Sequence, residues 1–90
     1  MDDHQKRLWG YMIELIESYL NGTSNNFSDL VGALEGALDA SEITDTTLIN
    51  SWYDFWTPLE IQRALNENNL DKKSATKHLT NMLDFLKSQL

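Results

Sequence analysis

LWGYMIELIESYLNG, residues 8–22, carries the periodicity that decides the fold of this 90-residue chain. Its apolar residues recur at intervals of three and four, which places them on one face of an α-helix. They are Leu8, Trp9, Met12, Ile13, Ile16, Tyr19 and Leu20. Asn21 and Gly22 tolerate the left-handed conformation in which many helices end. The stretch therefore predicts an amphipathic helix that closes at these two residues.

Three further stretches repeat the amphipathic pattern, and none alternates polar and apolar residues as a strand does. The second predicted helix begins after Asn26, a good helix cap, and ends near Ala40. The fourth begins at Asp71 or Ser74 and runs to the end of the chain. Its apolar stripe comprises Ala75, Leu79, Met82, Leu83, Leu86 and Leu90. Because short connections return each helix beside its predecessor, residues 1–90 are expected to form one all-α domain, a four-helix antiparallel bundle.

Pro58 interrupts the third predicted helix, which begins at Thr44 or Thr46 and continues to about Asn66. Proline inside a helix removes a hydrogen bond and clashes with the preceding turn. Thr57 and Pro58 also match the start of a new helix, with a cap, a proline at the first position and a glutamate at the third. We therefore expect this helix to be kinked or broken near Pro58.

The charge of the chain is segregated along its sequence. Between Leu8 and Gln62 there are nine carboxylates and no lysine or arginine, whereas residues 63–90 hold five cations and three carboxylates. The whole chain carries a net charge of −7. A one-sided acidic field repels nucleic acid and acidic membranes and attracts basic proteins. A basic protein partner is the first functional hypothesis, and the alternative is an acidic surface that only prevents aggregation.

The sequence offers few groups for catalysis or metal binding. It has no cysteine and two histidines, His4 and His78, neither of which has a carboxylate at catalytic or metal-ligand spacing. It also lacks a glycine-rich phosphate loop, a zinc spacing and a nucleophile elbow. We expect a protein that is not an enzyme and holds no cofactor or metal. Without a signal peptide or a membrane-spanning stretch, it is expected to be cytoplasmic.

Two glycines give the second predicted helix an unusual outer side. Gly32 and Gly36 lie almost opposite its apolar stripe, and each costs up to about 1 kcal/mol relative to alanine in a helix interior. This pair, the glycine ridge, lets another backbone approach closely. The neighbour is either another helix of the same chain or a partner chain. Glu35 and Asp39 border the ridge and would give it a negative rim.

The candidate partner-binding site extends from this ridge into the third predicted helix. Its further acidic members are Glu42, Asp45 and Asp54, which with Glu35 and Asp39 are expected to steer a basic partner. Tyr53, beside Asp54, is expected to be an exposed interface anchor, because tyrosine offers large area and a hydroxyl.

Three stretches carry a resemblance to known proteins: LIESYLNGTSNNFSDL (15–30), LEGALDA (34–40) and WYDFWTPLE (52–60). Together they resemble small, acidic, uncharacterised bacterial proteins of about this length. The predicted shape is also similar to four-helix bacterial immunity proteins, which neutralise nuclease toxins. This resemblance implies an immunity or inhibitor protein that occludes a basic partner such as a nuclease toxin. The alternative is a small structural or regulatory subunit that acts through homodimerisation or complex assembly.

Overall fold

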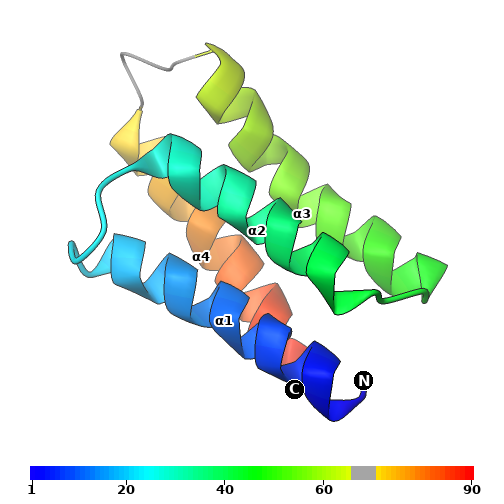
Figure 1. Cartoon of the computed structure of the whole chain (residues 1–90). Helices are drawn as coiled ribbons and strands as arrows, with labels where there is room; N and C mark the ends of the chain where they lie inside the picture. Colours follow the sequence, from blue (N-terminus) through cyan, green and yellow to red (C-terminus); the bar gives the residue numbers. More distant parts are fainter. Residues whose placement is uncertain (66–70) are drawn as a thin grey trace.

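The computed structural model describes residues 1–65 and 71–90, and these residues form four α-helices without a strand. The helices are α1 (Asp3–Leu20), α2 (Phe27–Ser41), α3 (Thr46–Leu65) and α4 (Lys72–Ser88). Successive helices run in opposite directions (Figure 1). The predicted all-α, four-helix antiparallel bundle is therefore confirmed. Within the two described ranges, no helix is long and apolar enough to cross a lipid bilayer.

The four helices form a ring around one apolar core. Both α1 and α3 pack against α2 and α4, so α1 lies diagonally across from α3, and α2 diagonally across from α4. Every helix contributes buried side chains to the centre, among them Trp9, Met12, Ile16, Val31, Leu34, Trp52, Leu59, Leu79, Met82 and Leu86. The diagonal placement of α2 and α4 has an electrostatic consequence, because these are the most acidic and the most basic of the helices.

Three buried tryptophans join helices by hydrogen bonds as well as by packing. Each indole N–H donates to an atom of another helix, so burying the indole leaves no unsatisfied donor. The bonds run from Trp9 Nε1 to the Leu86 carbonyl oxygen (2.8 Å), from Trp56 Nε1 to the Val31 carbonyl oxygen (3.0 Å) and from Trp52 Nε1 to Met12 Sδ (3.4 Å). The last of these crosses the core from α3 to α1. The aromatic stretch of α3 is thus tied to its neighbours.

A side-chain cap precedes each of the four helices. Asp2 accepts from the Gln5 amide and Gln5 reaches back to the Asp2 amide, which forms a capping box and starts α1 well before the predicted apolar stripe. Asn26 caps α2 as predicted, and Asp71 caps α4. Asp45 Oδ1 accepts from the Leu48 amide at 3.1 Å and caps α3 in the same way.

The break considered at Pro58 is wrong, and so is the continuation of the fourth helix to the end of the chain. Helix α3 continues through Pro58 to Leu65, so no new helix starts there, and a kink at Pro58 stays a prediction. Trp56 and Leu59 are buried on either side of the proline, and their packing holds the helix together despite the lost hydrogen bond. Leu90 is 64% exposed because α4 ends before it. The predicted end of the third helix near Asn66 lies outside the described residues.

Candidate partner-binding surface

The glycine ridge faces away from the bundle. Gly32 and Gly36 are exposed, and a methyl group added to either would meet no atom of a neighbouring segment within 4 Å among the described residues. The expectation that another helix of the same chain packs on the ridge is therefore wrong, since α2 turns the opposite side of its wheel towards the core. The alternative, a partner chain on the ridge, stays a prediction.

His4 shows which surface of α1 borders α2. Its Nε2 lies 3.0 Å from the Ala40 carbonyl oxygen, which joins the start of α1 to the end of α2. Tyr11 lies two turns after His4 on the same side of α1, and Gly36 lies one turn before Ala40 on the same side of α2. The 46% exposed side chain of Tyr11 and the glycine ridge therefore belong to one surface.

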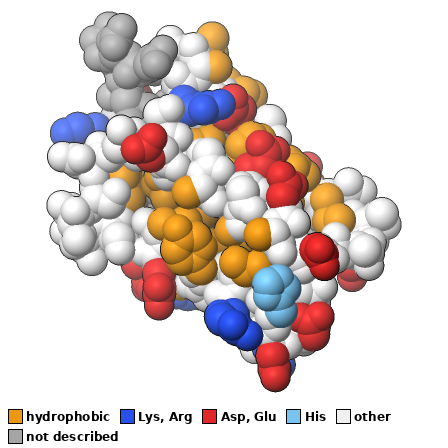
Figure 2. All heavy atoms as spheres, viewed as in Figure 1, with side chains coloured by type: hydrophobic (Ala, Val, Ile, Leu, Met, Phe, Trp, Pro, Cys, Tyr) orange, Lys and Arg blue, Asp and Glu red, His pale blue; other side chains and the backbone are white. Residues whose placement is uncertain are grey.

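We call this surface the α1–α2 face and define it by Tyr11, Gly32, Gly36 and Ala40. Figure 2 shows orange apolar side chains gathered over α1 and α2, with red acidic and some blue basic side chains around them. Tyr11 is a surface residue that was not predicted, although its position at the edge of the apolar stripe of the first helix was a usable signal. The face thus combines an exposed aromatic side chain with a stretch of bare helix backbone.

Tyr53 and Glu35 lie on the other flank of α2, where they connect it to α3. The Tyr53 hydroxyl donates to Glu35 Oε2 at 3.0 Å, and its ring packs edge-on against Trp52 and Trp56 with ring centroids 5.0 and 5.6 Å away. The expectation of an exposed anchor at Tyr53 is wrong, because its side of α3 faces α2 and the ring is partly buried. Its hydroxyl is already used within the bundle.

Electrostatics place Asp39 close to this bond. Burial raises the pKa of the Tyr53 hydroxyl, and the hydrogen bond to Glu35, the charge of Glu35 and the charge of Asp39 raise it further. Glu35, Asp39 and Tyr53 therefore form one cluster. Asp39 is exposed, so its carboxylate remains accessible from outside the bundle.

The other predicted acidic residues have different surroundings. Glu42 is the exposed C-cap of α2 and adopts the left-handed conformation with φ of 57°. Asp45 caps α3, so its carboxylate stabilises the fold as well as adding charge. Asp54 is exposed and lies about 100° around α3 from Tyr53. The structure therefore brings Glu35, Asp39 and Tyr53 together, whereas Asp54 points away from the α2–α3 contact.

No lysine or arginine of the described chain pairs with a carboxylate of α2. The ion pairs between described residues join Lys87 to Glu17 at 3.2 Å, across α4 and α1, and Arg63 to Glu60 within α3. The lysines of α4 are Lys72, Lys73, Lys77 and Lys87. Because α4 lies diagonally across the bundle from α2, its lysines do not neutralise the acidic field on α2 locally. The cations on the adjoining helix α1 are Lys6 and Arg7, and Arg7 lies one turn before Tyr11 on the same side of α1.

The described residues contain no group of three histidine, aspartate or glutamate side chains placed to hold a metal ion. The chain matches no protein-family model, and comparisons with curated proteins and with solved structures give no match. The similarity to four-helix immunity proteins therefore stays a prediction.

Proposed function

We propose that this chain is a non-catalytic, cytoplasmic binding module that docks a basic protein on the α1–α2 face and occludes it, as an immunity protein occludes a nuclease toxin. The observation that carries the proposal is the open glycine ridge, flanked by carboxylates that form no ion pair among the described residues. Two glycines inside one helix cost about 1 kcal/mol each relative to alanine. No neighbouring helix of the described chain uses the space that they leave.

The α1–α2 face has the composition of an interface that is completed by another protein. Binding energy at interfaces concentrates on a few aromatic or arginine side chains that become fully desolvated, surrounded by a polar rim. Tyr11 supplies an exposed aromatic side chain, and the glycine ridge lets a partner backbone come close to α2. Asp39 and Glu42 supply a rim of charge on the same helix and its cap.

The sign of the charge selects the partner. Helix α2 contains carboxylates and no cation, and its charges lack an ion pair within the described residues. A partner with lysine or arginine around an apolar centre would complement this face, and an acidic or nucleic-acid partner would be repelled. The lysines of α4 lie across the bundle from α2, so the molecule has an acidic side and a basic side. This charge separation would orient the molecule as it approaches a basic partner.

The first experiment identifies the partner and tests occlusion. Immobilised protein is exposed to a lysate of the source cells at low and at high salt, and the retained protein is purified and assayed with and without the module. The proposal predicts one basic protein, released by salt and inhibited at equimolar module. Retention of nothing, or only of further copies of the chain, contradicts it, and the second result supports the homodimer alternative.

A matched pair of charge variants tests the steering role. Asp39→Asn and Asp84→Asn change the net charge equally, but Asp39 lies on α2 and Asp84 on the far side of the bundle on α4. At low salt, Asp39→Asn is expected to slow association with the purified partner about two- to fivefold, and Asp84→Asn to leave the rate nearly unchanged. Equal effects of the two variants would mean that only the total charge matters.

A further inference from the structure

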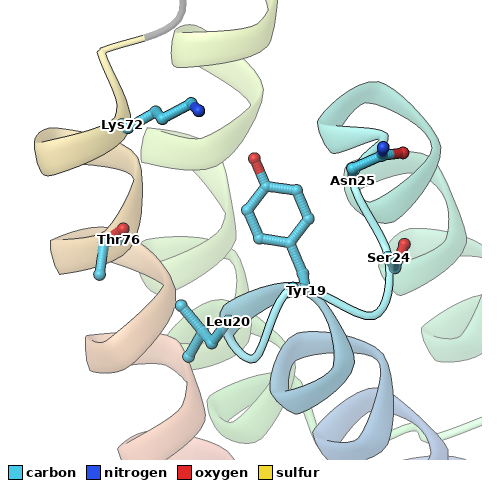
Figure 3. Close-up of a pocket in the computed structure, with 7 residues that line it drawn as sticks. Tyr19, Leu20, Ser24, Asn25, Lys72 and Thr76 are labelled. Atoms are coloured by element: carbon cyan, nitrogen blue, oxygen red, sulfur yellow. The ribbon is translucent and has the colours of Figure 1, made fainter.

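A pocket lies at the end of the bundle where α1 ends and α4 begins. It has a volume of about 290 Å³. Its lining includes Tyr19, Leu20, Ser24, Asn25, Lys72 and Thr76, which come from α1, the connection to α2 and the first turns of α4 (Figure 3). Ligand pockets usually have volumes from about 300 Å³ upwards. This pocket lies just below that range, which limits its ligand to a small molecule and excludes a peptide segment.

Among the described residues, the polar side chains around this pocket have no partner, and all of them except partly buried Tyr19 are exposed. No described residue forms a side-chain hydrogen bond or an ion pair with any of them. They are the hydroxyls of Tyr19, Ser24 and Thr76, the amide of Asn25 and the ammonium group of Lys72. A few convergent polar groups in a partly apolar cavity are the usual composition of a small-molecule site.

Tyr19 is held in place by the core while its hydroxyl reaches the pocket. Its ring packs edge-on against buried Phe27, with ring centroids 5.8 Å apart and an interplanar angle of 64°. Figure 3 shows the Tyr19 hydroxyl directed into the space between Lys72 and Asn25. Burial raises the pKa of this hydroxyl, so that it stays protonated at neutral pH and can donate a hydrogen bond.

The local charge of the pocket is opposite to that of the whole chain. None of the described residues that line it is acidic, although the chain has 14 carboxylates, and Lys72 adds a full positive charge. Helices α2 and α4 both begin at this end of the bundle (Figure 1), where Asn26 and Asp71 cap their N-termini. The neighbouring Asp71 carboxylate lies outside the lining and accepts from the amides of Lys73 and Ser74. It keeps its negative charge, so the attraction for an anion comes from Lys72 within the lining.

We infer that this pocket binds a small organic anion. Its carboxylate or phosphate group would lie between the Lys72 ammonium group and the Tyr19 hydroxyl. Its apolar part would pack against Leu20 and the ring of Tyr19. This site is separate from the α1–α2 face, so it does not depend on the proposed protein partner.

Nuclear magnetic resonance titration with four probes tests the inference. Benzoate and phenyl phosphate carry an apolar ring and an anionic group, inorganic phosphate carries only the anionic group, and benzyl alcohol is a neutral control. The two organic anions are expected to give saturable amide shifts confined to residues 19–25 and 72–76. Inorganic phosphate should bind more weakly than phenyl phosphate, and benzyl alcohol should bind weakest, because it lacks the charge-assisted contact.

Two lysine variants separate a specific contact from the general field. Lys72→Gln is expected to weaken phenyl phosphate about tenfold, whereas Lys73→Gln, which removes the same charge one residue outside the lining, should change the affinity less than about twofold. Tyr19→Phe, which keeps the ring, should weaken binding severalfold. Equal losses in the two lysine variants, equal binding of benzyl alcohol, or the absence of saturable shifts would each overturn the inference.

Discussion

The Tyr53 hydroxyl donates a hydrogen bond to Glu35 Oε2 at 3.0 Å across the contact between α2 and α3. Because the Tyr53 ring also packs on Trp52 and Trp56, one side chain links a carboxylate of the acidic helix to the aromatic core. This bond fixes Glu35, while Asp39 on the next turn stays exposed. The acidic side of α2 is therefore part structural and part open to a partner.

Tyr53→Phe tests the structural part of this relationship. The substitution keeps the ring and removes the hydrogen bond, so the free energy of unfolding at neutral pH should fall by about 1 kcal/mol. Chemical denaturation followed by circular dichroism measures this value. An unchanged free energy of unfolding would mean that hydration of Glu35 and of the Tyr53 hydroxyl is as favourable as the hydrogen bond between them.

The stability difference between wild type and Tyr53→Phe should depend on pH, and the direction of the raised pKa of Tyr53 gives its sign. The folded-state pKa of Tyr53 is raised above its ordinary value of about 10, so its stabilisation is complete below that pH and is lost as the pH rises through the folded value. Unfolding free energies of wild type and Tyr53→Phe should therefore converge at strongly alkaline pH. All other titratable groups are present in both proteins, so their contributions cancel in the difference. A gap that stays constant or widens with pH would contradict the assignment.

The open space at the glycine ridge predicts that alanine stabilises the fold. Gly32→Ala and Gly36→Ala should each raise the free energy of unfolding by about 0.5–1 kcal/mol, because the added methyl meets no neighbour and the unfolded chain loses freedom. Gly22→Ala is the matched control and should destabilise, since Gly22 has φ of +86°. Thermal and chemical denaturation measure all three variants. A loss of stability at position 32 or 36 would mean that the ridge is packed internally.

Two substitutions of Asp45 distinguish its role as a helix cap from the effect of its charge. Asp45→Ala should lower the free energy of unfolding by about 1 kcal/mol, because the Leu48 amide loses its acceptor. Asp45→Asn keeps a good cap and removes the charge, so its stability should lie within a few tenths of a kcal/mol of wild type. If the two variants were equally destabilised, the contribution of Asp45 would come from its charge.

The elements of the bundle could be predicted because their signals are local. The caps at Asn26 and Asp71, the apolar stripes and the buried Trp52 and Trp56 all follow from residue spacing within one helix. A break at Pro58 could not be judged from spacing, because the packing of the neighbouring turns decides whether a helix survives a proline.

The surface could be predicted only in part, since it depends on which helices meet. Tyr53 is half-buried because Glu35, eighteen residues earlier, lies opposite it, and no local pattern reports such a pair. The glycine ridge was located correctly on the wheel of α2. Whether it meets another helix depends on where α4 lies, which residue spacing does not specify.

The most direct measurement of the central claim is the affinity of Gly36→Gln for the purified basic partner, compared with that of Asn81→Gln on α4. Both substitutions place a glutamine on an exposed helix position, and the one at position 36 should not reduce fold stability. The proposed docking on the α1–α2 face predicts that Gly36→Gln weakens binding about tenfold or more and that Asn81→Gln leaves it unchanged. Wild-type affinity in a folded Gly36→Gln variant would contradict it.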